Sequence, residues 1–199
     1  MNIPTITTQR LLLTISGPEA AEQFVQFNRE NDLHLAPWNG PMGARAFDVD
    51  ACREDLERQI KAFHDDRRYS FTIFRADSGP GGPVLGYINY GEVVRGLSQA
   101  AYMGYALAAR AEGHGYMTEA AKASLQYMFE TVRLHRIMAN YQPQNHRSAA
   151  VLRRLGFTIE GMARNYLYIG NAWKDHVLTS LTNPHPAPPS GLAPAPRPV

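Results

Sequence analysis

The sequence predicts a single α/β domain with a mixed central sheet and helices on both faces. Three observations lead to this prediction. The chain has 199 residues, of which 44% are hydrophobic, and this suits one domain with a substantial core. Strand-like and helix-like patterns are interspersed along the chain rather than separated into blocks. The strand patterns include antiparallel hairpins and at least one strand–helix–strand crossover, which together favour a mixed sheet.

Hydrophobic spacing and breaker residues define the elements expected in the first half of the chain. Residues 8–16, with their run of Leu, Thr and Ile, predict a first strand. A Gly-Pro break then precedes helical spacing over residues 19–31. Residues 34–38 are expected to form an irregular link. Residues 50–64 predict a second helix with many charges on one face.

The second half of the chain predicts strands separated by turns and two helices. The strongest helix is expected over residues 115–134, where apolar residues recur in a stripe at helical spacing. Strand patterns cover residues 69–75, 84–94, 99–107, 136–141, 157–168 and 173–181, with a Gly- and Pro-rich turn over 78–83 and a short helix over 148–155. These elements place the folded domain at residues 1–183.

Composition and charge narrow the class of protein. Residues 184–199 hold seven of the 14 prolines and are expected to be disordered. A net charge of +2 predicts no direct nucleic-acid site, because such sites show clustered Lys and Arg. The N-terminal residues lack a signal-peptide core, and no apolar run approaches the roughly 20 residues that cross a bilayer. With Cys52 as the single cysteine, these features favour a cytoplasmic protein without membrane contact.

A loop with two glycines lies between the strand over 99–107 and the long helix. It runs from Arg110 through Gly113 and Gly115, and the helix follows at once. The start of a helix carries unpaired N–H groups and a partial positive charge, so it can bind a pyrophosphate. The glycines leave room for that approach. The loop lacks the third glycine of a Rossmann fingerprint and the lysine of a Walker loop. Taken alone, it is also compatible with a plain turn.

A second block follows the strand over 136–141. Asn145 is placed to cap the short helix, and Ser148 then lies in the first turn of that helix. Gly156 is placed to end it. The simplest interpretation is that these residues only cap a helix, and that role is compatible with a functional one. The seven histidines lack the spacing of a metal site such as H-E-x-x-H, so we expect no metal.

Together, the two blocks resemble the GNAT acetyltransferase superfamily. The Arg110 to Gly115 loop resembles its pyrophosphate motif, and the run from Asn145 to Phe157 resembles its fourth-helix motif. Longer strings at 34–38, 93–96, 102–105, 135–141 and 175–179 resemble the RimJ-type ribosomal-protein alanine N-acetyltransferases. The resemblance covers residues 8–182. It implies a mostly antiparallel sheet with two splayed parallel strands, 103–107 and 137–141, and acetyl-CoA laid between them.

The resemblance also implies the partner and the cofactor contacts. The acceptor would be the N-terminal alanine of ribosomal protein S5, and the enzyme would be a monomer or a homodimer. Backbone groups of the first splayed strand, the glycine loop and the start of each helix would hold acetyl-CoA. The residues expected there are Tyr105, Ala106, Leu107, Arg110, Gly113, His114, Gly115, Tyr116, Met117, Thr118, Asn145 and Ser148.

The catalytic residues are less sharply implied. Many GNAT enzymes carry a tyrosine seven residues after the motif Asn, but Leu152 occupies that position here. Ser148 is the nearest replacement as proton donor to the leaving thiolate, with Tyr141 in reserve. Glu92 is a candidate base acting through water. The acceptor slot is expected to be lined by Trp38, Tyr90, Glu92, Tyr141, Asn165 and Tyr166, although core packing is the alternative for each aromatic residue.

Two other functions remain open from the sequence. One is a small-molecule N-acetyltransferase acting on an antibiotic or a polyamine. Sites for such cations generally need several acidic residues, and few are available near the expected slot. The other is a non-catalytic acetyl-CoA-binding factor in ribosome assembly. Leu152 and Asn140, where related enzymes carry a tyrosine and a glutamate, keep this second alternative open.

Overall fold

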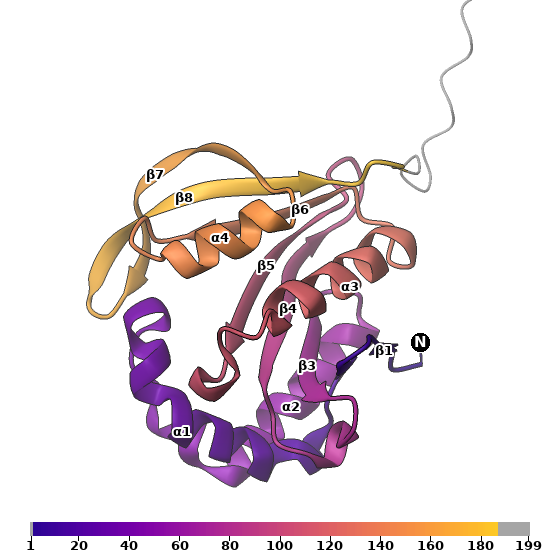
Figure 1. The fold of residues 1–199 in the computed structure, drawn as a ribbon, viewed down its shortest axis with the longest axis vertical. Helices are drawn as coiled ribbons and strands as arrows, with labels where there is room; N and C mark the ends of the chain where they lie inside the picture. Colours follow the sequence, from indigo (N-terminus) through magenta and orange to yellow (C-terminus); the bar gives the residue numbers. More distant parts are fainter. Residues whose placement is uncertain (1, 187–199) are drawn as a thin grey trace, which may run out of the picture.

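The computed structural model describes residues 2–186, and its centre is an eight-stranded mixed sheet (Figure 1). The strand order is β1-β2-β3-β4-β5-β6-β8-β7, and every neighbouring pair is antiparallel except β5 and β6. The predicted fold class is confirmed. The elements are β1 (Thr5–Thr7), β2 (Leu11–Thr14), α1 (Ala21–Asn39), α2 (Val49–His64), β3 (Tyr69–Arg75), β4 (Gly86–Val94), β5 (Ala100–Leu107), α3 (Tyr116–Glu130), β6 (Arg136–Tyr141), α4 (His146–Arg154), β7 (Thr158–Ile169) and β8 (Ala172–Thr182).

The helices cover opposite faces of the sheet. Side chains alternate along a strand, and β4 shows where each face points. The hydroxyl of Tyr90 lies 2.8 Å from Ser124 of α3, whereas Tyr87 packs its ring against Phe27 of α1. Figure 1 shows α3 and α4 together in front of the sheet and α1 passing below it. From here on, we call the two faces of the sheet the α3–α4 face and the α1 face.

The first helix is longer than the sequence predicted. Residues 34–38 continue α1 and do not form an irregular link, so that prediction was wrong. Leu35 is buried one turn beyond Asn31, and this contact with the core favours continuing the helix. Pro37 removes one N–H donor, which would have bonded to the carbonyl of Leu33. Leu33 is 90% exposed, so water can replace that donor.

A fork in the sheet provides the space for a site. The parallel strands β5 and β6 pair only over residues 100–102 and 136–138. Beyond Tyr102 and Met138 they are no longer hydrogen-bonded, and the remaining length of β5 faces a gap. The splayed parallel strands implied by the resemblance are therefore confirmed. Backbone groups on this side of β5 have no strand partner, which leaves them free to pair with a ligand.

Two predictions concern the C-terminal tail and the boundary of the domain. The tail expected to be disordered, residues 184–199, lies almost entirely beyond the described residues, so that prediction stays open. The domain boundary at residue 183 stays a prediction as well. Within residues 2–186, no helix has both the length and the apolar character that a bilayer span requires.

Candidate active site

A cleft of about 1010 Å³ opens at the fork between β5 and β6. It reaches from the start of α3 and the length of α4 to the last turns of α1, so it joins the two faces of the sheet. Most residues expected from the sequence to contact acetyl-CoA or the acceptor line it. These are Trp38, Tyr105, Ala106, Leu107, Gly113, Gly115, Tyr116, Met117, Thr118, Tyr141, Asn145 and Ser148.

The glycine loop presents a row of free amides to the cleft. Gly113 and Gly115 have φ angles of 79° and 77°, in the left-handed region that favours glycine. Added Cβ atoms would meet nothing within 4 Å at Gly113 and only Arg10 Nη2, at 3.7 Å, at Gly115. Among the described residues, the N–H groups of residues 113–118 donate no hydrogen bond. Six consecutive free N–H groups at a helix start can bind an anion such as a pyrophosphate.

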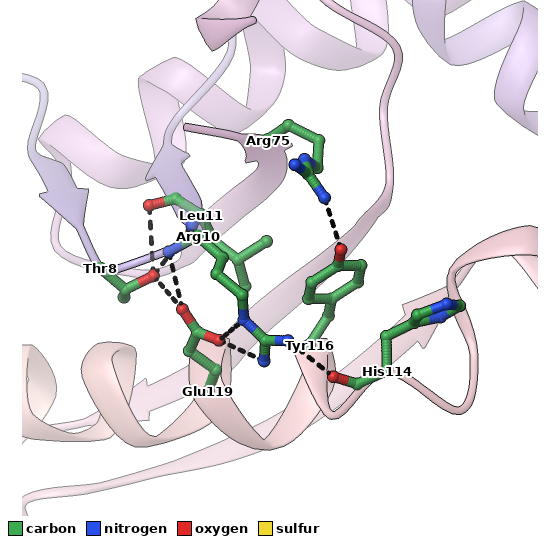
Figure 2. Close-up of polar contacts among 7 residues, drawn as sticks. All are labelled: Thr8, Arg10, Leu11, Arg75, His114, Tyr116 and Glu119. Atoms are coloured by element: carbon green, nitrogen blue, oxygen red, sulfur yellow. Dashed lines mark hydrogen bonds and ion pairs between the residues drawn. The ribbon is translucent and has the colours of Figure 1, made fainter. Parts of the chain in front are cut away.

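The N-terminal segment braces this loop from outside the cleft (Figure 2). Glu119 on α3 accepts hydrogen bonds from the Thr8 hydroxyl at 2.6 Å and from Arg10 Nε at 2.7 Å. Arg10 Nη1 then donates to the backbone carbonyl of His114 at 3.0 Å. The arginine thereby ties the loop to the first turn of α3. The sequence did not reveal this brace, because its partners are about a hundred residues apart.

Tyr116 belongs to the same brace through its side chain. Its hydroxyl accepts a hydrogen bond from Arg75 Nη1 at 2.6 Å, and the guanidinium of Arg10 lies 4.7 Å from its ring centre. The ring is buried and points toward these arginines, as Figure 2 shows. Tyr116 therefore offers the cleft chiefly its backbone N–H. The imidazole of His114 stacks on the same ring, 5.5 Å between centres, and does not line the cleft.

A pair of hydroxyl groups connects β5 to α4 inside the cleft. Tyr105 Oη lies 2.7 Å from Ser148 Oγ. The side chain of Asn145 accepts a hydrogen bond from Ser148 N at 3.0 Å, so the predicted helix cap is confirmed. Burial raises the pKa of Tyr105 to about 12, with the hydrogen bond between Tyr105 and Ser148 opposing the rise and Tyr141 adding to it. Tyr105 is therefore protonated at neutral pH and can donate a hydrogen bond to Ser148.

Two of the residues expected in the acceptor slot lie elsewhere. Tyr90 is fully buried in the core with its hydroxyl on Ser124, and burial raises its pKa. Side chains alternate along β4, and the Tyr90 side chain is one of those that point to the α3–α4 face. Glu92 is exposed in a β-bulge with a φ of 52°, outside the residues that line the cleft. The placements expected for Tyr90 and Glu92 are therefore corrected.

Three further expected residues do not line the cleft. Arg110 donates to the carbonyl of Val84 at 3.1 Å, which holds its guanidinium away from the amide row. Asn165 has a φ of 48° and donates its backbone N–H to Asp175, at an exposed irregularity of β7. Tyr166 does not line the cleft, but its hydroxyl accepts a hydrogen bond at 3.3 Å from Asn140, which does. Burial, then Tyr102 and the charge of Glu92, raise the pKa of Tyr166.

Several residues that line the cleft were missed from the sequence. Lys122 on α3 and Arg147 and Arg154 on α4 give it positive charge beside the amide row. A signal existed in their spacing, since Lys122 follows Thr118 by four residues and the two arginines are seven apart, so each set lies on one helix face. On the α1 face, Asn140 also lines the cleft, as Trp38 does.

Gln142 connects the end of β6 to the end of α1. Its buried side chain donates to the carbonyls of Pro37 and Trp38, at 3.3 Å each. Without the last turns of α1 these carbonyls would lie elsewhere, so the extended helix helps to shape the α1 face of the cleft. Leu152, at the position where many related enzymes have a tyrosine, is 2% exposed and packs in the core. Within residues 2–186, no group of three or more His, Cys, Asp or Glu side chains is close enough to hold a metal ion.

Comparisons with known proteins agree with this geometry. The family model described as acetyltransferase (GNAT) domain matches residues 10–158. The chain is 37% identical to the ribosomal protein uS5-alanine N-acetyltransferase of Escherichia coli (strain K12), over 92% of this chain and 94% of that protein.

Solved structures give the same result. The ribosomal-protein-S5-alanine acetyltransferase of Vibrio fischeri superimposes with a TM-score of 0.87 at 30% identity, covering 93% of this chain and 100% of that one. RimJ of Mycobacterium smegmatis, in complex with CoA-disulfide, gives a TM-score of 0.80 at 27% identity, covering 90% and 86%. The resemblance found in the sequence is thus confirmed. The chain belongs to the GNAT acetyltransferase family, and it is an N-acetyltransferase with acetyl-CoA as its cofactor.

Proposed function

We propose that this chain acetylates the α-amine at the N-terminus of a protein, with the N-terminal alanine of ribosomal protein S5 as acceptor. One observation carries the proposal: the cleft crosses the sheet at the fork, with an amide row on the α3–α4 face and mainly uncharged side chains on the α1 face. Similarity to the uS5-alanine N-acetyltransferase over nearly the whole of both chains supports this acceptor. The reaction would take place in the cytoplasm.

The residues of the α3–α4 face fit the cofactor. The free N–H groups of residues 113–118 would bind the pyrophosphate, and the unpaired edge of β5 from Met103 to Leu107 would pair with the pantetheine amides. Lys122 and Arg154 would add positive charge near the phosphates. Bound in this way, acetyl-CoA supplies an acyl group activated as a thioester.

The α1 face fits an N-terminal amine better than a polyamine. Glu112 and Glu119 are the only carboxylates lining the cleft among residues 2–186, and both already pair with cations. Glu112 is bound to Arg147 and lies 3.3 Å from His34, while Glu119 is bound to Arg10. A polycation would need free carboxylates to replace its hydration. An α-amine has a reference pKa of about 7.7–8.0, so near neutral pH part of it is uncharged.

The chemistry expected of the chain uses two groups already in place. A backbone N–H on β5 near Tyr105 would bind the oxygen of the acetyl carbonyl as negative charge develops there. Ser148 would donate its proton to the departing sulfur, and Tyr105 would hold that hydroxyl in position at 2.7 Å.

The brace offers a test of the cofactor placement. Replacing Glu119 with glutamine removes the charge that holds Arg10, so the His114 carbonyl loses its anchor and the amide row becomes less ordered. We expect the affinity for acetyl-CoA to fall roughly fivefold, since charge-assisted hydrogen bonds at a partly exposed site contribute about 1 kcal/mol. Isothermal titration calorimetry measures the change. Glu130→Gln is the matched control, because Glu130 lies on the same helix and, among residues 2–186, its side chain bonds only to Gln126.

The same brace predicts a pH dependence of stability. Burial alone would raise the pKa of Glu119, but hydrogen bonds from Thr8 and Arg10 outweigh it and lower the pKa. A lowered pKa means that the stabilisation is present above the unfolded value of about 4.3 and is lost as the pH falls through the folded value. Between pH 6 and pH 3, the free energy of unfolding should therefore fall more for the natural protein than for Glu119→Gln. Urea titrations at each pH measure the free energy of unfolding. An equal decrease in the two proteins between pH 6 and pH 3 would contradict the brace.

The function itself is tested with peptides. The protein is incubated with acetyl-CoA and peptides that begin with Ala, Ser, Met or acetyl-Ala. A second set of reactions uses S5 with a free N-terminus. Mass spectrometry measures the mass of each product. We expect one added acetyl group on the Ala peptide and on S5, and none on the blocked peptide. Acetylation of spermidine or an aminoglycoside instead would support the small-molecule alternative. Cofactor binding with no product on any amine would support the non-catalytic one.

A further inference from the structure

His176 on β8 is a buried titratable group that the proposed chemistry has not used. It is 3% exposed, yet it lines the cleft. The centre of its ring lies 5.6 Å from that of Tyr166, and its Nδ1 lies 3.1 Å from the backbone carbonyl oxygen of Lys174. His176 lies in the string over 175–179 that resembles the RimJ-type enzymes, but no spacing in the sequence assigned it a role.

The hydrogen bond to Lys174 determines which ring nitrogen carries the proton. A carbonyl oxygen only accepts, so Nδ1 must be the donor and the neutral ring leaves a lone pair on Nε2. Nε2 makes no hydrogen bond with the described residues, and among those residues no polar side-chain atom is both shut off from solvent and without a partner. Nε2 therefore keeps some contact with solvent, and His176 lines the cleft.

The strand register places His176 on the α1 face. Asn140 pairs with Leu178 and Tyr141 with Val177 across β6 and β8. Side chains alternate along a strand, so His176 shares its face with Leu178 and Asn140. Tyr141 points to the α3–α4 face, where it raises the pKa of Tyr105. The hydroxyl pair and the imidazole thus flank the fork from opposite sides, which is the arrangement that a proton donor and a proton acceptor need around one reacting carbon.

We propose that His176 is the general base that deprotonates the acceptor amine, an assignment that rests on the proposed function. Nε2 takes one proton from the ammonium form of the acceptor and passes it to solvent. The freed lone pair of the amine forms the N–C bond to the acetyl carbon while the C–S bond breaks. Ser148 gives a proton to the sulfur, which keeps the electron pair of the broken bond. The second proton lost by the nitrogen as it becomes an amide replaces the one that Ser148 gave.

Polar and charged groups face His176 from several neighbouring strands. Tyr166 faces it from β7, with Glu92 acting on Tyr166 from β4. Asn140 on β6 and Gln142 just after it bring no charge. On its own strand, Lys174 offers its carbonyl, and Asp175 is bound to the backbone of Asn165. On α1, His34 lies beside Glu112.

The test compares His176→Asn with the natural protein. The asparagine amide can still donate to the Lys174 carbonyl but cannot titrate, so the fold is kept while the base is removed. We expect kcat/KM for the alanyl peptide to fall about 100-fold at pH 7 and the deficit to shrink by pH 9, where the free amine predominates. Affinity for acetyl-CoA should stay within twofold. His135→Asn, at an exposed histidine beside β6, is the matched control and should change neither value.

A second readout does not depend on turnover. Long-range proton–nitrogen NMR spectra of histidine-labelled protein report the tautomer directly. We expect Nδ1 protonated and Nε2 bare, with the Nε2 signal shifting when alanyl peptide is added. His176→Ala should regain activity with added imidazole. A pH-independent loss in His176→Asn, or an unchanged rate, would overturn the assignment, and so would an Nε2–H tautomer. If the natural protein acetylates no N-terminal peptide, the proposed function fails, while the tautomer and its response to peptide still decide the assignment.

Discussion

Replacing Gly113 with tryptophan is expected to weaken acetyl-CoA binding about 100-fold or more while the protein stays folded. Gly113 has a φ of 79° and faces open space, with nothing within 4 Å of an added Cβ. An indole there would cover the free N–H groups of residues 113–118 and exclude a pyrophosphate. Calorimetry with acetyl-CoA measures the loss. Thermal unfolding should shift by only about 2–8 °C, since a left-handed residue with a side chain costs about 1–2 kcal/mol.

Gly96→Trp is the matched control for this substitution. Gly96 has a φ of 70°, has nothing within 4 Å of an added Cβ and lies in the loop between β4 and β5, outside the cleft. It should therefore bear the same backbone strain without any effect on cofactor affinity. Equal losses in both variants would indicate general damage. Unchanged affinity in Gly113→Trp would refute the placement of the pyrophosphate on the amide row.

Replacing Ser148 with alanine is expected to lower kcat about 100-fold and to leave the affinity for acetyl-CoA within a few-fold. The Ser148 hydroxyl is the proton donor proposed for the departing sulfur, and loss of a general acid typically costs 10²–10⁴-fold. The Asn145 cap would survive, because it accepts from the backbone N–H of residue 148. Single-turnover rates of acetyl transfer at pH 7.5 report the chemical step without product release.

Two tyrosine variants separate the roles of the hydroxyl groups. Tyr105→Phe removes the partner at 2.7 Å and should lower kcat about tenfold, because Ser148 keeps its proton but loses its orientation. Burial raises the pKa of Tyr105 to about 12, so this effect should not vary between pH 6 and pH 9. Tyr141→Phe should leave kcat nearly unchanged. A larger loss in Tyr141→Phe than in Ser148→Ala would make Tyr141 the donor.

Local patterns predicted most of the elements and the amide row. They missed β1 (Thr5–Thr7), because a single first strand was expected over residues 8–16, where only β2 (Leu11–Thr14) lies. The bounds of β3 and β6 follow from short-range alternation, and the loop glycines announce a backbone that L side chains rarely adopt. Asn145 as a cap is equally local, because it bonds to a residue three positions away. Each of these features depends on neighbours in the chain, so a single sequence contains the information.

The predictions that were wrong for Tyr90 and Glu92 depend on which face of the sheet each side chain points to. Alternation says that Tyr90 and its neighbours point to opposite sides, but it does not say which side is core. Tyr90 was therefore expected in the slot together with Trp38, but its packing on α3 places it in the core. Glu92 lies in a β-bulge of β4 that the sequence did not predict, so its side chain does not follow the regular alternation.

The family, the strand and helix pattern and the loop that can bind an anion could all be predicted from the amino-acid sequence, because they depend on short-range spacing and on strings shared with relatives. Which side chains meet depends on the folded structure. Arg10 reaches Glu119 across 109 residues, Tyr105 reaches Ser148 across 43, and His176 enters the cleft through the register of β8 on β6. Such contacts depend on how the whole core packs, and no local pattern contains that information.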